Sequence, residues 1–119
     1  MSLIATLITA LFITVVLIPY LMRYADRLGL VDLPGERKVH LHSVPRIGGV
    51  AIVIAFMIPF IIWFPKTQEF AGVIASVLLL FTFGVWDDRS DISYRIKFGG
   101  QFLAALAAVA VGDIRIEWI

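Results

Sequence analysis

The sequence predicts an all-α integral membrane protein, with four transmembrane helices bundled in one membrane domain, residues 1–119. Hydrophobic residues make up 61% of the chain and charged residues 16%, and the mean hydropathy is +0.96. A soluble domain of this size is usually about half apolar and about a quarter charged. The apolar residues also form long runs, as membrane spans do. The net charge of +1 gives no sign of a nucleic-acid partner, and the lack of cysteine excludes disulfides and thiolate metal sites.

Four apolar segments are candidates for spans: residues 3–22, 47–65, 70–86 and 98–112. The first has twenty residues without a charge. It lacks the basic start and small-residue cleavage site of a signal peptide, so we expect an anchor. The fourth is short, because it covers only about 23 Å of a hydrocarbon core that is about 30 Å thick. This span must extend further, tilt, or thin the bilayer locally.

Basic residues are distributed unevenly between the two sides of the predicted bundle. The loops formed by residues 23–46 and 87–97 carry eight of the ten: Arg23, Arg27, Arg37, Lys38, Arg46, Arg89, Arg95 and Lys97. The other side holds only Lys66 and Arg115. Because basic loops stay in the cytoplasm, we expect both loops there and both termini facing outward.

The outward tail, residues 113–119, alternates polar and apolar side chains. That alternation is typical of a half-buried strand, and a lone strand is not stable without a partner to pair with. We therefore expect this chain to be the front of a larger polytopic fold.

Three carboxylates, Asp87, Asp88 and Asp91, stand where the third span should end. Carboxylates are costly at a bilayer boundary, and the negative end of the helix dipole disfavours them further. They need a positive partner, and Mg²⁺ is the obvious candidate because it binds one or two carboxylates together with substrate phosphates. If the helix runs on through Asp91, the three carboxylates share a face. Alternatively, Asp91 caps the fourth helix or pairs with Arg95, and Asp88 is held by Arg89.

The first cytoplasmic loop is rich in groups that bind phosphate. Arg37, Lys38 and Arg46 are charged donors, and Gly48 and Gly49 leave backbone N–H groups uncovered where the second helix starts. Alternatively, this is an ordinary basic juxtamembrane loop attracted to anionic lipid head groups.

Three further residues have both a structural and a functional interpretation. His40 and His42 are two residues apart, which makes a poor helical metal pair, and a solvated or structural role is the default for each. Either could still donate to a phosphate or a sugar hydroxyl. Lys97 is either a snorkelling anchor or a phosphate ligand opposite the metal.

Two stretches carry a family resemblance. They are "VDLPGERKVHLHSVPRIGGVAI", residues 31–52, and "FGVWDDRSDISYRIKFGGQFLAA", residues 83–105. The chain resembles the polyprenyl-phosphate N-acetylhexosamine-1-phosphate transferases, integral membrane enzymes with about ten or eleven spans. The pattern is closest to the branch that uses UDP-N-acetylglucosamine or a similar nucleotide sugar. The resemblance covers essentially this whole chain but only about the first third of a typical member, so later aspartate and histidine motifs of the family are not in it.

The resemblance implies a reaction and a site. A sugar 1-phosphate, expected to be N-acetylglucosamine 1-phosphate, passes from a UDP-sugar to undecaprenyl phosphate and UMP leaves. This is the first membrane step of cell-envelope polysaccharide synthesis, in the bacterial inner membrane. Asp87 and Asp88 would be catalytic and, with Asp91, would hold Mg²⁺ or Mn²⁺. The residues implied around the phosphates are Arg37, Lys38, His40, Arg46, Gly48, Gly49 and Lys97.

Two other functions remain open. The chain could be an inactive truncated or split product that only assembles with a complementary C-terminal segment or with copies of itself. It could also be a small four-span protein that binds anionic lipid. A lipid-binding protein gains nothing from Asp87 and Asp88 beside an anionic leaflet, which argues against the last. We expect the isolated 119-residue chain to have no activity of its own.

Overall fold

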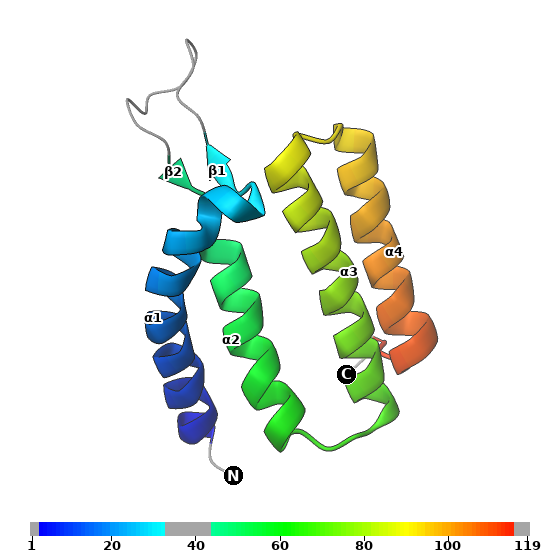
Figure 1. Ribbon diagram of the computed structural model, residues 1–119. Coiled ribbons are helices and arrows are strands. Elements are labelled where there is room, and N and C mark those ends of the chain that lie inside the picture. The colour runs from blue at the N-terminus through cyan, green and yellow to red at the C-terminus, as the bar shows by residue number, and fades with distance from the viewer. Residues whose placement is uncertain (1–2, 33–43, 116–119) are drawn as a thin grey trace.

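The computed structural model describes residues 3–32 and 44–115, and they form a bundle of helices. The helices are α1, Leu3–Leu28, α2, Gly48–Trp63, α3, Gln68–Ser90, and α4, Tyr94–Gly112. Two short strands, β1 (Val31–Asp32) and β2 (Val44–Pro45), pair antiparallel. Figure 1 shows the helices side by side, with the strand pair and the α3–α4 turn at the same end. The predicted all-α membrane bundle is confirmed, and the strand pair is a small addition to it.

The helices do not end where the apolar segments end. α1 continues six residues past Met22, α3 continues four residues past Trp86, and α4 begins four residues before Phe98. α2 is shorter than the segment 47–65. Hydropathy marks the part of a helix that lies in lipid, whereas polar residues can continue the same helix beyond it. The predicted loop 87–97 is therefore wrong in extent, since only residues 91–93 separate α3 from α4.

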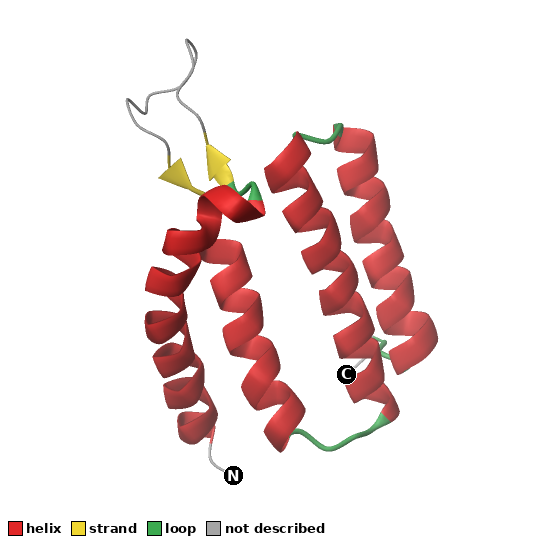
Figure 2. Cartoon of the chain, in the orientation of Figure 1, coloured by secondary structure: helices red, strands yellow, loops and turns green. Residues whose placement is uncertain are grey.

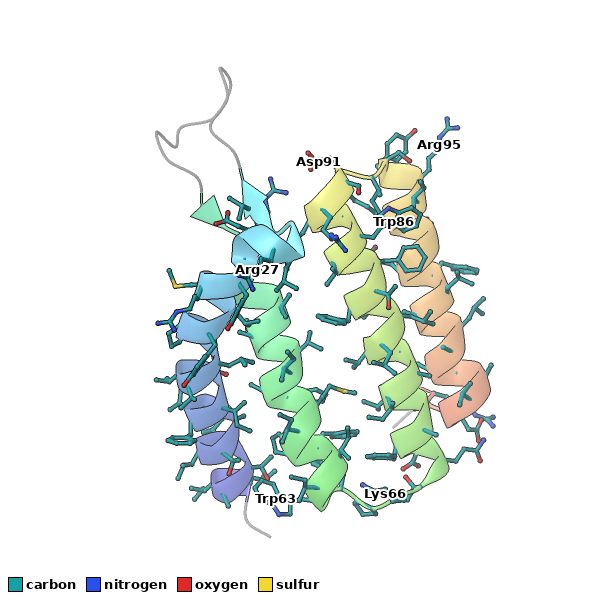
Figure 3. The ribbon with its side chains drawn as sticks, in the orientation of Figure 1. Arg27, Trp63, Lys66, Trp86, Asp91 and Arg95 are labelled. Atoms are coloured by element: carbon teal, nitrogen blue, oxygen red, sulfur yellow. The ribbon has the colours of Figure 1, made fainter. Side chains whose placement is uncertain are left out.

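Among the described residues, α1, α3 and α4 are long and apolar enough to cross a membrane. α4 has 19 residues and at 1.5 Å per residue covers about 28 Å, so the expected shortness of the fourth span disappears. α2 has 16 residues and is apolar throughout, but it covers only about 24 Å. Figure 3 shows apolar side chains along the length of the bundle, with Arg27, Asp91 and Arg95 at one end and Trp63 and Lys66 at the other.

The bundle consists of two helical hairpins, α1–α2 and α3–α4, which meet mainly where α2 faces α3. Small residues let α3 and α4 approach closely. A Cβ atom on Gly72 would lie 2.3 Å from the Cα of Gly112, and one on Gly100 would lie 2.5 Å from the ring of Phe83. Close backbone packing of this kind is typical of membrane helices, because lipid tails give helices no hydrophobic reason to associate.

A small apolar cluster joins the hairpins at the end that carries the strands. Its buried members come from α1, the strand region and α2: Ala25, Leu30, Ile47 and Val50. Phe81 and Val85 of α3 pack against it. The chain turns out of α1 through Gly29, which has a φ of +69°, a conformation that glycine adopts without steric cost. This cluster fixes the start of α2 beside the last turns of α3.

We predict that Gly72→Leu destabilises the chain by about 2 kcal/mol or more, because the new side chain would overlap the backbone at Gly112 and force α3 and α4 apart. Unfolding in mixed detergent micelles, followed by circular dichroism, measures the change. Gly84→Ala is the matched control. No atom lies within 4 Å of a Cβ at Gly84, so this change in the same helix should be neutral or mildly stabilising. Equal losses for the two variants would contradict the packing.

The orientation is tested by labelling single cysteines, which is straightforward because the sequence has none. Ser90→Cys, at the end of α3, and Ser43→Cys, which lies outside the described residues, should resist an impermeant maleimide applied to intact cells. Gln68→Cys, at the opposite end of α3, should react readily. Efficient labelling at position 43 or 90 would overturn the cytoplasmic placement of both loops.

Candidate functional site

The end of α3 determines where the three carboxylates lie. The helix continues through Asp87 and Asp88 and stops at Asp91, whose backbone is left-handed with φ 44° and ψ 63°. The N–H of Asp91 donates to the carbonyl of Asp87 at 2.8 Å. Asp91 is therefore the C-cap of α3, whereas Ser93 occupies the N-cap position of α4. The alternative in which Asp91 caps the fourth helix is therefore wrong.

The alternative pairing of Asp91 with Arg95 is also not present among the described residues. The Nε of Arg95 donates to the hydroxyl of Tyr94 at 3.3 Å, and its guanidinium lies over the same ring. Figure 3 shows Arg95 pointing away from Asp91. Asp91 and Arg95 thus contact residues other than those that their spacing in the sequence indicated.

Asp87 faces α4. Its Oδ1 lies 3.0 Å from the Nζ of Lys97, which stands in the first turn of α4. The same oxygen is buried, and its contact with Lys97 is an ion pair without a hydrogen bond of regular geometry. Lys97 was predicted as an anchor or a phosphate ligand, and its first partner is instead a carboxylate. The three-residue turn between the helices brings this pair together.

Asp88 faces the other way, toward α2. It lies at the charged end of a groove of about 280 Å³ between α2 and α3. Gly49 and Gly84 also border this groove, and the remaining lining is apolar. The expected contact with Arg89 does not occur, because the Arg89 side chain packs over Gly29, with its Nε 3.2 Å from where a Cβ would stand. Asp88 is thus half-buried and has no charged partner in the described part of the chain.

Asp91 faces the base of the strand pair. Its Oδ1 lies 3.6 Å from Nη1 of Arg46, the residue that follows β2. The backbone N–H of Arg46 donates to the carbonyl of Leu30 at 2.7 Å, which holds Arg46 close to the end of α1. Sequence reasoning placed Arg46 among phosphate ligands and did not foresee this pair.

The structure does not bring the three carboxylates together. Within residues 3–32 and 44–115, no group of three or more histidine, aspartate or glutamate side chains is arranged to hold a metal ion. A metal held by side chains of these described residues alone therefore does not fit. Mg²⁺ shared between one or two carboxylates and substrate phosphates does fit, since Asp88 borders an open groove and the neighbouring Asp87 carboxylate stands at the same end of α3.

The predicted phosphate ligands are only partly in view. Arg37, Lys38 and His40 lie outside the described residues. Gly48 and Gly49 form the first turn of α2, are exposed, and have no atom within 4 Å of a Cβ position. The N-cap residue, Ile47, provides no side-chain hydrogen bond to this turn. Free N–H groups at a helix start attract anions, and here they open beside the groove that Asp88 borders.

One contact of the site could have been found from sequence. Asp87 and Lys97 are ten residues apart, and Ser93 is a helix-capping residue type between them. Placing the turn at residues 91–93 puts the last turn of one helix beside the first turn of the next. Treating the whole of 87–97 as a loop concealed that juxtaposition.

Comparison with known proteins supports the family resemblance carried by the two sequence motifs. Residues 70–119 match the family described as glycosyl transferase family 4. A probable undecaprenyl-phosphate N-acetylglucosaminyl 1-phosphate transferase of Bacillus subtilis is 32% identical over 110 residues, which are 92% of this chain and 30% of that protein. An undecaprenyl-phosphate α-N-acetylglucosaminyl 1-phosphate transferase of Pasteurella multocida is 29% identical over 98% of this chain and 32% of its own length.

A third relative, the undecaprenyl-phosphate α-N-acetylglucosaminyl 1-phosphate transferase of Thermotoga maritima, is 36% identical over 74% of this chain and 26% of its own length. No solved structure matches the chain. The chain spans about a third of the length of the curated relatives. The resemblance predicted from the two motifs is therefore confirmed: residues 70–119 match glycosyl transferase family 4, and most of the chain is similar to polyprenyl-phosphate N-acetylglucosaminyl 1-phosphate transferases.

Proposed function

We propose that this chain supplies the acid-bearing part of a sugar-phosphate transferase. The reaction moves N-acetylglucosamine 1-phosphate from a UDP-sugar to undecaprenyl phosphate and releases UMP. The observation that carries the proposal is the arrangement at the end of α3, where adjacent carboxylates with different neighbours stand beside Lys97, Arg46 and the open start of α2. The lipid phosphate and the sugar phosphate in this proposal are taken from the names of the relatives.

The chemistry requires charge neutralisation more than proton transfer. An oxygen of the lipid phosphate attacks the sugar-bearing phosphorus, and the bond from that phosphorus to the UMP oxygen breaks. Both reactants are anions, so positioning and electrostatic stabilisation dominate. A lipid phosphate is largely ionised near neutral pH, so no strong general base is needed. Asp87 and Asp88 would hold Mg²⁺, or Mn²⁺ in its place, and the ion would neutralise charge on the pyrophosphate.

The membrane geometry suits a lipid substrate. The charged end of the bundle lies where apolar helices emerge, which is the depth at which a lipid phosphate sits. The N–H groups of Gly48 and Gly49 and the cation of Lys97 lie at that same end and favour anions there. We propose that this end faces the cytoplasm of a bacterial inner membrane, where nucleotide sugars are available.

In a full-length transferase that contains this chain, Asp87→Asn or Asp88→Asn should lower sugar-phosphate transfer at least about a hundredfold. Loss of a preorganised charge in such a site costs about 3 kcal/mol, and about 1.4 kcal/mol is a factor of ten. UMP release with Mg²⁺ present measures the effect. Asp91→Asn is the matched control and should cost less, because Asp91 points toward Arg46. Near-normal turnover in Asp87→Asn or Asp88→Asn would remove that residue from the site.

The isolated 119-residue chain should have no measurable transferase activity. A site for two phosphates, a metal and a nucleotide must be held by several surrounding groups, and the described residues offer few that could bind uridine or a sugar ring. The assay is UMP release from UDP-N-acetylglucosamine by purified chain in lipid with undecaprenyl phosphate and Mg²⁺. Release that needs both substrates and is lost in Asp88→Asn would show instead that these spans suffice.

A further inference from the structure

The relative position of the two hairpins depends on few contacts. α3 and α4 make the most extensive contact and α1 and α2 the next, whereas α2 and α3 touch much less. At the charged end, the contacts between the hairpins within residues 3–32 and 44–115 include the apolar packing of Phe81 and Val85, the Arg89 side chain over Gly29, and the ion pair between Arg46 and Asp91. Of these contacts, the pair of Arg46 and Asp91 joins opposite charges, one from each hairpin.

Each partner of the pair is oriented by its own backbone. The left-handed conformation of Asp91 ends α3 and turns its side chain out of the helix, and aspartate and asparagine tolerate that conformation better than most residues. Arg46 follows β2, and its N–H is bonded to Leu30. Two residues later α2 begins at Gly48. The pair therefore joins a residue two positions before the open start of α2 to a residue three positions after Asp88.

We propose that Arg46 and Asp91 are a positioning pair, which holds the N-terminal turn of α2 in place against the acid-bearing end of α3. The functional importance of this alignment rests on the proposed function, whereas the alignment itself does not. The pair reassigns two residues, because Arg46 was expected to bind phosphate and Asp91 to bind metal. Neither role is needed to explain where their side chains point.

The solvent exposure of the two side chains determines whether losing the pair should affect folding or only the alignment of the hairpins. The Asp91 side chain is 84% exposed and that of Arg46 is 31% exposed. Exposed ion pairs contribute little to folding stability. Losing the pair should therefore leave the helices folded and loosen the alignment of one hairpin against the other.

The test is a distance measurement between the hairpins in lipid nanodiscs. Spin labels at Met22→Cys on α1 and Ile96→Cys on α4 use two exposed positions, and the absence of native cysteine keeps the labelling clean. The parent chain should give a narrow distribution of distances by double electron–electron resonance. Asp91→Asn and Arg46→Gln should each broaden it, and the double variant should broaden it no further than either alone. Arg46→Lys keeps the charge and should restore the narrow distribution.

The matched control is Asp113→Asn. Asp113 is also a helix C-cap with a left-handed backbone and also pairs with an arginine, but its partner is Arg115 of the same segment. This variant should leave the distribution narrow, and circular dichroism should show unchanged helicity in every variant. A narrow distribution in Asp91→Asn, or a parent distribution as broad as that of the variants, overturns the proposal. No substrate is used, so the outcome is independent of whether the chain takes part in sugar-phosphate transfer.

Discussion

The cost of placing a charge in hydrocarbon is the constraint on which this structure depends. In the described helices, every charged side chain stands within six residues of a helix end. Charges excluded from the middle of the bundle must gather at its ends, where acids and bases become neighbours. The contacts of Asp87 with Lys97 and of Asp91 with Arg46 follow from that crowding. Apolar spans thus concentrate the polar chemistry in a thin layer at one end.

Helical geometry then separates the acids. Successive residues on a helix point about 100° apart, so Asp87 and Asp88 cannot face the same neighbour. α3 lies between α2 and α4, and each carboxylate meets a different one of them. A pair of adjacent aspartates in such a position is two sites, one already neutralised by a lysine and one open to a groove. A ligand that engages both must bridge the edge of α3.

The sequence was sufficient to predict four helices, their order and the end at which the acids gather, because hydropathy depends on composition alone. It was not sufficient for the helix ends. Residues 23–28 and 87–90 are polar enough to resemble loop, yet they continue their helices outside the apolar layer. The directions of the acidic side chains could not be predicted from the sequence either. Asp91 has capping chemistry for either helix, and only the left-handed turn that the packed hairpin requires decides between them.

The three-residue turn between α3 and α4 also bears on how the protein is made. Contacts between residues close in sequence form fastest, and chains fold from the N-terminus as they are synthesised. Asp87 and Lys97 are ten residues apart, so their contact can form as soon as α4 has emerged. Arg46 and Asp91 are 45 residues apart, and they meet only when two separately inserted hairpins come together. One half of this charged layer is thus assembled during synthesis, and the other half waits for docking within the membrane.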